Sequence, residues 1–224
     1  MPTVCVMEGL TPPFEGLTVS EEELAKGYSY RVTRYADVIL RDAFPRHWSE
    51  LLATLAGLTI DLEADILRPG GNRSEIAARF DSALRERGWG KENMDIETHI
   101  NAQLIAKVRS HEIDMFKLGP DNRFPGVAVE MEWNNKDPFF DRDLSNFYTL
   151  HRAGALAVGI IVTRSAALQQ RLAVVARQHG LPTKYGASTT HWNKLMPRVD
   201  VGGGGECPLF LIGIGTERVR GLAD

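Results

Sequence analysis

The chain has 224 residues, 43% of them hydrophobic, and its net charge of -3 argues against a protein that coats nucleic acid without sequence preference. Its longest apolar run, residues 155–162, is far shorter than the roughly 20 residues that a membrane-spanning helix needs. The beginning of the chain lacks the basic and apolar segments of a signal peptide, and Cys5 and Cys207 are too few for a disulfide framework or a zinc site. We therefore expect a single domain over residues 1–224, in the cytoplasm and without a membrane partner.

Charge is distributed unevenly along the chain. Residues 1–143 contain 17 Lys and Arg against 25 Asp and Glu, whereas residues 144–224 contain 9 against 4. The basic side chains of the last third could meet the phosphates of a nucleic acid. An ordinary solvated surface explains the same distribution, so both interpretations stay open.

The N-terminal part, residues 1–95, has a helical pattern. Ser20 precedes three glutamates, which is typical of a helix N-terminus. Residues 35–58 carry apolar side chains at helical spacing. Asn72 with Glu75 three positions later resembles a capping box, which predicts a helix that continues through Arg87 and stops at a glycine.

The middle of the chain changes to the two-residue period of β-strands. Residues 126–134 place Val127, Val129, Met131 and Trp133 on one face and Ala128, Glu130, Glu132 and Asn134 on the other. Residues 110–117 place Ile113 and Met115 on one face and Glu112 and Asp114 on the other. Turn-forming residues at 119–122 predict that the two strands form an antiparallel hairpin, which brings Asp114 near Glu130.

Strands and helices alternate in the rest of the chain. The pattern predicts a helix over residues 141–155, a buried strand over 156–163, a second helix over 165–179 and a final strand over 208–215. Together with the hairpin, these elements indicate an α/β fold, in which a mixed sheet core is flanked by helices on both faces.

Asp114, Glu130 and Glu132 are the candidate catalytic residues. Phosphodiester hydrolysis needs a divalent cation at the scissile phosphate, and hard cations such as magnesium prefer carboxylate oxygen ligands. In such a site, Asp114 and Glu130 bind the metal, the Met131 carbonyl completes its shell, and Glu132 contacts the attacking water. Alternatively, Glu130 and Glu132 lie on the solvent face of an edge strand, where apolar and charged residues often alternate.

Four separated blocks of sequence occur in an order typical of one nuclease family. They are HEIDMFK at residues 111–117, VEMEWNNKD at 129–137, FDRDLSNF at 140–147 and GIIVTR at 159–164. In these blocks the chain resembles the BglII/BamHI-type restriction endonucleases, over about residues 72–215. The resemblance implies the PD-(D/E)xK nuclease fold, with a restriction-endonuclease-like catalytic core at residues 96–215. It also implies type II cleavage of both strands of palindromic double-stranded DNA, with Mg2+ (or Mn2+ in its place), giving 5'-phosphate ends.

The resemblance assigns roles to the acidic residues. It makes Asp114 the metal-binding aspartate, Glu130 the second ligand, and Glu132 the residue at a position that is lysine in most of the superfamily. A glutamate occurs there on the BamHI side of the group, so the missing lysine does not count against activity, but the general base stays open. Glu75 is similar in position to an auxiliary acidic residue of the superfamily, and helix capping explains it equally well.

Two polar segments are candidates for contacting DNA. Asn134, Asn135 and Lys136 follow the catalytic strand at the place where the family enters the major groove, and Asn is typical of adenine recognition. A turn at the end of the strand explains the two asparagines as well. Residues 185–194 resemble the recognition loop of the same enzymes, and a plain surface loop is the alternative. In this second segment the expected DNA-binding residues are Ser188, Thr189, Thr190, His191 and Lys194, with Lys184 and Arg198 near phosphate.

A palindromic site has two-fold symmetry, so we expect a homodimer on double-stranded DNA. The helices predicted at residues 141–155 and 165–179 supply either the dimer surface or the core. A DNA methyltransferase of the same system is expected as a functional partner outside any complex. Three other functions stay open: an inactive DNA-binding relative, a repair or junction nuclease of the same fold, and a glycoside hydrolase that uses Glu130 and Glu132. The retained carboxylates argue against the first, and Asp114 with the downstream asparagines argues against the last.

Overall fold

The computed structural model describes residues 27–68 and 74–222. The helix expected after Ser20 and the cap expected at Asn72 fall outside the described residues. Within these ranges, no helix combines the length and the apolar character that crossing a membrane requires.

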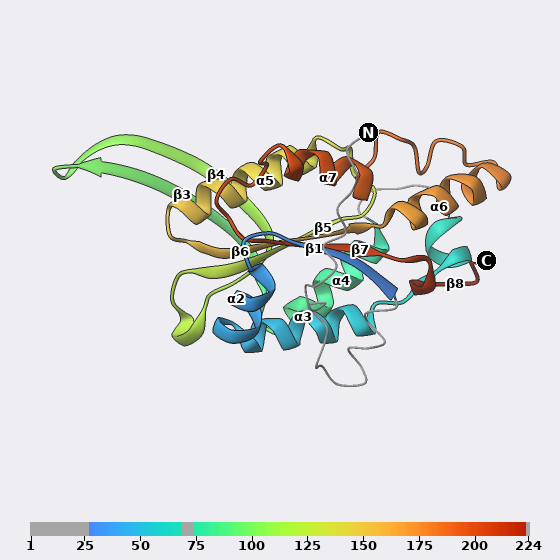
Figure 1. Cartoon of the computed structure of the whole chain (residues 1–224), viewed down its shortest axis with the longest axis horizontal. Helices are drawn as coiled ribbons and strands as arrows, with labels where there is room; N and C mark the ends of the chain where they lie inside the picture. Colours follow the sequence, from blue (N-terminus) through green and yellow to red (C-terminus); the bar gives the residue numbers. More distant parts are fainter. Residues whose placement is uncertain (1–26, 69–73, 223–224) are drawn as a thin grey trace.

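A mixed six-stranded sheet forms the centre of the molecule, with the strand order β1-β7-β6-β5-β4-β3 (Figure 1). The strands are β1 (Tyr28–Val32), β3 (Gly90–Ile100), β4 (Gln103–Lys117), β5 (Gly126–Glu132), β6 (Leu156–Arg164) and β7 (Leu209–Ile214). β5, β6 and β7 are parallel, whereas β1, β4 and β3 pair antiparallel with their neighbours. A separate parallel pair joins β2 (Ile60–Asp61) to β8 (Val219–Arg220).

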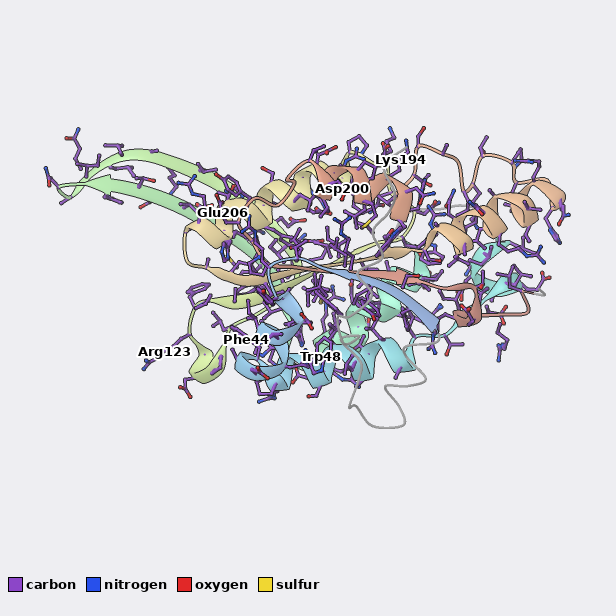
Figure 2. All side chains as sticks on the ribbon, in the orientation of Figure 1. Phe44, Trp48, Arg123, Lys194, Asp200 and Glu206 are labelled. Carbon is purple, nitrogen blue, oxygen red and sulfur yellow. The ribbon has the colours of Figure 1, made fainter. Side chains whose placement is uncertain are left out.

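Helices cover both faces of the sheet, as the sequence predicts. On one face lie α2 (Ala36–Ala43), α3 (Pro45–Gly57), α4 (Glu75–Arg85) and α6 (Ala166–Gln178), and on the other lie α5 (Phe139–Arg152) and α7 (Trp192–Asp200). The short turns are η1 (Leu62–Ile66), η2 (Pro120–Asn122) and η3 (Thr216–Arg218). Figure 2 shows Phe44 and Trp48 in the first helical layer and Lys194 and Asp200 in the second.

The three parallel strands are buried almost completely, because helices cover both of their faces. Val129 of β5 points into the core beneath α3 and α4, whereas Ala128 points into the core beneath α5. Glu130 and Glu132 follow Ala128 at the two-residue period and are buried as well. They therefore lie inside the protein and not on the solvent face of an edge strand.

The apolar stripes of α5 and α6 pack inside the chain. Phe140 and Phe147 of α5 belong to one core cluster, and Leu168 and Leu172 of α6 belong to the other. Of the two roles expected for these stripes, the structure therefore supports the core.

The helical description of residues 1–95 is incomplete, because two strands of the sheet lie in this part. β1 pairs with β7 at one edge, and β3 pairs with β4 at the other. β3 and β4 form a long hairpin that extends beyond the body of the sheet (Figure 1), and it turns at Asn101 and Ala102, which both have positive φ. Most side chains of β3 are exposed, so no apolar pattern marks the strand in the sequence.

The start of α4 also differs from the prediction. Ser74 caps the helix, since its hydroxyl oxygen accepts a hydrogen bond from the Ile76 amide at 3.2 Å. Glu75 is then the first helical residue, where its carboxylate interacts favourably with the positive end of the helix dipole. The helix ends at Arg85, two residues before the predicted Arg87.

The predicted hairpin of β4 and β5 is confirmed, with one correction. The two strands are antiparallel and align Met115 with Val129. The alternation places Ile113 and Met115 on one face, but the register of β4 shifts between Ile113 and Phe116. Ile113 therefore packs beneath α5, while Met115 packs on the side of α3 and α4. Regular pairing with β5 ends at Met115, so Asp114 lies where the two strands separate.

Candidate active site

The C-terminal half of β5 presents two carboxylates to α5. Glu130 and Glu132 are 1% and 2% exposed, and Asp143 of α5 is 0% exposed. Each of the three side chains offers a carboxylate oxygen within 4.8 Å of the others. Among the residues that the structure describes, this acidic cluster is the group of three that could hold a metal ion.

Each carboxylate of the cluster has an oxygen that the chain satisfies. Glu130 Oε1 accepts a hydrogen bond from the Asp114 backbone amide at 3.1 Å. Glu132 Oε2 accepts one from Asn135 Nδ2 at 2.8 Å. Asp143 Oδ1 accepts two, from Arg142 Nε at 2.9 Å and from Arg142 Nη2 at 2.7 Å. The second oxygens of Glu130 and Asp143, by contrast, are buried without a hydrogen-bond partner.

Burial raises the pKa of all three carboxyl groups. The pKa of Glu130 lies well above its usual range, because burial and then repulsion from Asp143 and Asp114 disfavour its charge. Burial, followed by repulsion from Asp143, raises the pKa of Glu132 to about 8. Burial also raises the pKa of Asp143 to about 6, although Arg142 opposes the shift. The negative charge of the cluster thus exceeds what the chain compensates, which fits a site for a divalent cation.

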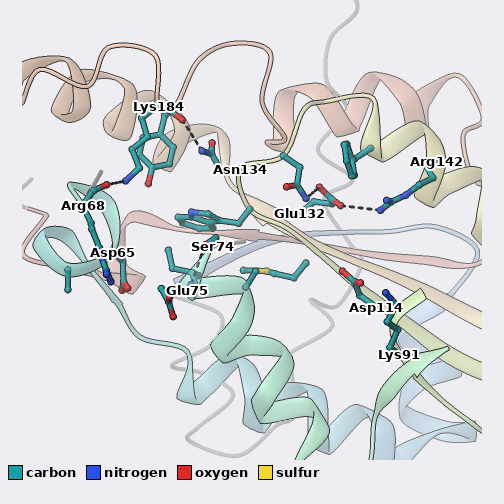
Figure 3. Close-up of a pocket in the computed structure, with 18 of the residues that line it drawn as sticks. Asp65, Arg68, Ser74, Glu75, Lys91, Asp114, Glu132, Asn134, Arg142 and Lys184 are labelled. Carbon is teal, nitrogen blue, oxygen red and sulfur yellow. Dashed lines mark hydrogen bonds and ion pairs between the residues drawn. The ribbon is translucent and has the colours of Figure 1, made fainter. Parts of the chain in front are cut away.

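Asp114 lies beside the cluster on the wall of a cavity of about 700 Å³ (Figure 3). Glu132 and Arg142 line the same cavity, and Glu75 of α4 lines it too. Asp114 is half-buried and reaches Glu130 through its backbone amide. The structure therefore brings Asp114, Glu130 and Glu132 together, as predicted, whereas the exposed Glu75 borders the cavity outside the cluster.

Met131 separates the two glutamates on β5. Its side chain packs into the core beneath α3 and α4, and the residue borders the same cavity. The backbone of β5 at Met131 therefore borders the cavity next to the carboxylates.

The two segments expected to contact DNA form one structure beside this cavity. Lys136 and Thr189 form an antiparallel bridge. The Thr190 amide donates to the Asn135 carbonyl at 2.9 Å, and the Asp137 amide donates to the Ser188 carbonyl at 3.0 Å. Backbone hydrogen bonds thus hold the end of the carboxylate strand against the polar loop.

Residues 28–214, from β1 to the end of β7, match the family described as Restriction endonuclease BglII/BglIII. The chain belongs to the BglII/BglIII restriction endonuclease family. A search of curated proteins gave no match. Membership confirms the resemblance seen in the four sequence blocks, and it makes the acidic cluster and its cavity the candidate active site of a restriction endonuclease.

The DNA-binding residues expected in this BglII/BglIII-family chain differ in accessibility. Asn135, Lys136 and Ser188 are exposed. Asn134 is half-buried, and its Nδ2 donates to the Lys184 carbonyl at 2.9 Å. These positions place exposed polar side chains from both segments at the same end of β5.

Other residues of the polar loop face the protein. Thr190 and His191 are buried, and Thr190 Oγ1 accepts the Asn135 amide hydrogen at 3.2 Å. Thr189 is half-buried and donates its hydroxyl to the Gly186 carbonyl at 2.7 Å. In the DNA-free chain the Thr190 and His191 side chains therefore face the inside of the loop, and their direct contact with DNA stays a prediction. Lys194 lies 3.3 Å from the Asp137 carboxylate.

Sequence reasoning misses two buried charged residues, one in the acidic cluster and one behind the polar loop. Asp143 occupies the apolar stripe of α5 between Phe140 and Phe147, and an acidic residue in such a stripe is the signal that would have found it. Arg164 ends the apolar strand β6 and is 0% exposed. Burial lowers the pKa of Arg164 to about 9.

Arg164, at the end of β6, holds the polar loop and lies against Trp133, the residue that follows β5. Its Nη2 donates to Thr189 Oγ1 and to the Thr190 carbonyl, both at 2.7 Å. Its guanidinium carbon lies 5.7 Å from the ring centre of Trp133 and 5.0 Å from that of Tyr185. Arg164 thus fixes the loop from within and has no direct contact with the cavity.

Proposed function

We propose that the protein is a type II restriction endonuclease that cuts both strands of palindromic double-stranded DNA and leaves 5'-phosphate ends. The observation that carries this proposal is the buried acidic cluster beside a cavity of about 700 Å³. Family membership over residues 28–214 supports the same class of reaction. Asp114, Glu130 and Glu132 are the proposed catalytic residues, and Glu75 at the cavity wall is an auxiliary acidic residue.

Magnesium is the proposed cofactor, and manganese would substitute for it. Asp114 and Glu130 would hold the ion, and the Met131 carbonyl would complete the shell. The buried Glu130 Oε2, which has no hydrogen-bond partner, is the kind of oxygen that a hard cation accepts as a ligand. When bound, magnesium lowers the pKa of an attacking water and stabilises the leaving oxygen.

The side chains of this chain orient the reacting groups. Glu132 orients the attacking water or takes its proton, and the hydrogen bond from Asn135 at 2.8 Å fixes the carboxylate of Glu132. Arg142 is half-exposed on the cavity wall, so its guanidinium is placed to bind a DNA phosphate. Glu132 lies on a strand and Arg142 on a helix, which hold them more rigidly than loops do.

Sequence recognition uses the exposed side chains at the end of β5. Asn135 reads a base with help from Asn134, and Lys136 and Ser188 contact base edges or phosphates. Thr189 lies in the same loop and Lys194 in the first turn of α7, and both extend this surface. Thr190 and His191 contribute by holding the loop in place.

Two identical active sites are needed to cut both strands of a palindrome, so the proposed active form is a homodimer. The dimer would use surfaces other than the apolar stripes of α5 and α6, which pack in the core. A DNA methyltransferase of the same system would protect the host DNA without forming a complex, and both proteins would work in the cytoplasm.

The first test is digestion of phage and plasmid DNA by the purified protein, with magnesium and with EDTA. We expect discrete fragments with magnesium, whose sequenced ends share one palindrome and carry 5'-phosphates. Glu130→Gln should abolish cutting, because the amide loses the charge that attracts the cation. Glu86→Gln is the matched control, since Glu86 is exposed at the opposite end of α4 from the cavity and should not affect cutting.

The other outcomes separate the alternatives. Intact DNA with a sequence-specific shifted complex would favour an inactive DNA-binding relative. Cutting only at branched or damaged DNA would favour a repair or junction nuclease. A protein that neither cuts nor binds DNA would overturn the proposal.

A further inference from the structure

Asp143 stands out because a charged residue occupies a position built for an apolar one. It lies on the buried face of α5 beside Leu144, within one turn of Phe140 and Phe147, and its side chain is inaccessible to solvent. These three apolar neighbours belong to the core cluster between α5 and the sheet. Burying a carboxylate in such surroundings destabilises a fold unless a partner compensates the charge.

Arg142, the basic partner of Asp143, satisfies only one oxygen of this carboxylate. Both hydrogen bonds from Arg142 go to Oδ1, at 2.9 Å and 2.7 Å, and none goes to Oδ2. Arg142 is itself 49% exposed, so solvent weakens the ion pair. Arg142 therefore balances the charge of Asp143 only in part. Because the carboxylate is buried, the remaining charge destabilises the fold.

A second oxygen in the same place has the same deficit. Glu130 Oε2 is buried without a hydrogen-bond partner, and Glu130 belongs with Asp143 and Glu132 to the cluster whose oxygens lie within 4.8 Å of one another. Each of these two buried carboxylates thus keeps one oxygen without a donor, in a cluster compact enough to share one ion. Carboxylate oxygens in a compact set are the ligands that a hard divalent cation prefers.

We propose that Asp143 is a further ligand of the divalent metal ion, beside Asp114 and Glu130. The inference rests on the proposed nuclease function and adds a fourth acidic residue, from a helix instead of the sheet, to the three carboxylates predicted from the sequence. Metal binding explains why a carboxylate occupies this buried position, which the ion pair with Arg142 does not explain.

Arg142 then has a second effect, as a competitor of the metal. Its Nη2 lies 2.7 Å from Asp143 Oδ1 and 3.7 Å from Glu132 Oε1, so one guanidinium touches two members of the cluster. A cation that binds to Asp143 releases this guanidinium toward the cavity that Arg142 lines. Removing the guanidinium should therefore strengthen metal binding, even though it breaks an ion pair.

The test measures Mn2+ binding to the DNA-free protein, from the electron paramagnetic resonance signal of the unbound ion. Asp143→Asn should weaken Mn2+ binding by at least about tenfold, since even outer partners of metal ligands change affinity by about 10- to 100-fold. Arg142→Gln should bind Mn2+ more tightly than the wild type. Asp141→Asn is the matched control, because Asp141 lies on the same helix but is 58% exposed and pairs with Arg198.

Each outcome decides one point. If Asp143→Asn binds Mn2+ as the wild type does while Glu130→Gln does not, Asp143 is not a ligand and the proposed nuclease function stands. If the wild type binds no Mn2+ and cuts no DNA, both proposals fail. If circular dichroism shows that Asp143→Asn is unfolded, the double variant Arg142→Gln with Asp143→Asn, which removes the ion pair as a whole, is compared with Arg142→Gln alone. Equal affinity of these two proteins would overturn the inference.

Discussion

Asn135 lies where the carboxylate strand meets the segment proposed to read DNA. Its Nδ2 donates to Glu132 Oε2 at 2.8 Å. A side-chain amide carries a second N–H and a carbonyl oxygen, which are the two groups that read adenine. One side chain is therefore able to hold the proposed catalytic Glu132 and contact a base at the same time.

Asn135→Ala should lower the single-turnover cleavage rate by about 10- to 100-fold, because a hydrogen bond to a charged group contributes about 1.5–3 kcal/mol. Single-turnover kinetics at saturating enzyme separates this effect from weaker DNA binding. Asn93→Ala serves as the control, since Asn93 is an exposed asparagine of β3, outside both segments expected to contact DNA. An unchanged rate in Asn135→Ala would show that Glu132 does not depend on this contact.

Tyr28 shows how one buried hydroxyl links the edge strand to the helical layer. Its hydroxyl donates to the Leu55 carbonyl of α3 at 2.7 Å. Burial raises the pKa of Tyr28 to about 12, above the value of 10.0 that applies to an exposed tyrosine. The folded state thus keeps the proton at pH values where the unfolded state loses it, so stability is complete below pH 10 and falls as the pH rises toward 12.

At pH 8, Tyr28→Phe should lower the free energy of unfolding by about 1 kcal/mol, because phenylalanine lacks the hydroxyl that makes this hydrogen bond. Between pH 10 and 11 the wild type should lose stability more steeply than this variant, because phenylalanine does not ionise. Urea unfolding at a series of pH values measures both effects. Tyr35→Phe is the control at an exposed position, and parallel pH curves for wild type and Tyr28→Phe would contradict the argument.

At the scale of elements, the polar loop depends on Arg164 while the sheet does not. Arg164 donates to Thr189 and to the Thr190 carbonyl, but its Nε and Nη1 are buried without partners. Its burial therefore brings a cost that offsets part of what its hydrogen bonds contribute.

Arg164→Met should change the free energy of unfolding by less than about 1–2 kcal/mol, since methionine keeps the apolar contacts and removes the buried charge. The loop, however, loses its anchor, so trypsin should cut after Lys184 several times faster than in the wild type. Urea unfolding and timed trypsin digestion separate the two effects. Arg177→Met, at an exposed position of α6, should alter neither the stability nor the cutting rate. If trypsin cuts Arg164→Met at Lys184 no faster than the wild type, Arg164 does not anchor the loop.

The outer part of the β3–β4 hairpin, residues 97–107, extends beyond the body of the protein (Figure 1). It exposes large apolar side chains at Ile100, Leu104 and Ile105. Residues 97–107 can be replaced by an Asn-Gly turn that joins Ile96 to its partner Val108. Because the deleted part contacts mainly itself, the melting temperature should stay within a few degrees of the wild type. Loss of cooperative thermal unfolding would show that the arm stabilises the sheet.

Elements with a strong apolar pattern were predictable from the sequence. The helix predicted at residues 165–179 is α6 with Ser165 as its cap, and the buried strand predicted at 156–163 is β6 with one more residue. β3 was missed because its exposed side chains leave no periodic signal. The expected common face of Ile113 and Met115 was wrong, because a local register shift does not alter the apolar pattern of the sequence.

The site was predictable where it follows the strand. The two-residue period placed Glu130 and Glu132 side by side, and the hairpin brought Asp114 to them. The apolar stripe of α5 signals that Asp143 is buried, but its approach to β5 depends on how α5 packs on the sheet. The inward direction of Thr190 and His191 likewise depends on Arg164, which is distant in sequence and meets the loop only in the fold.

At the scale of the whole molecule, the acidic cluster lies in the middle of the sheet. β5 has β4 on one side and β6 on the other, and helices cover both faces. Glu130→Gln in EDTA should therefore raise the free energy of unfolding by about 1–2 kcal/mol, because the neutral amide avoids the cost of burying or protonating this carboxyl group. Urea unfolding with EDTA and with Mn2+ measures this gain, which should shrink or reverse when the metal stabilises the wild type. A variant less stable than the wild type in EDTA would contradict this account.

The position of these carboxylates makes the lifetime of the protein depend on its ionic surroundings. A chain that carries unbalanced charge at its centre opens more often, and each opening exposes buried strands to proteases. An ion that binds only the folded form reduces the frequency of such openings. Divalent cations would then set how long the protein survives as well as whether it reacts, and a cell starved of them would clear it faster.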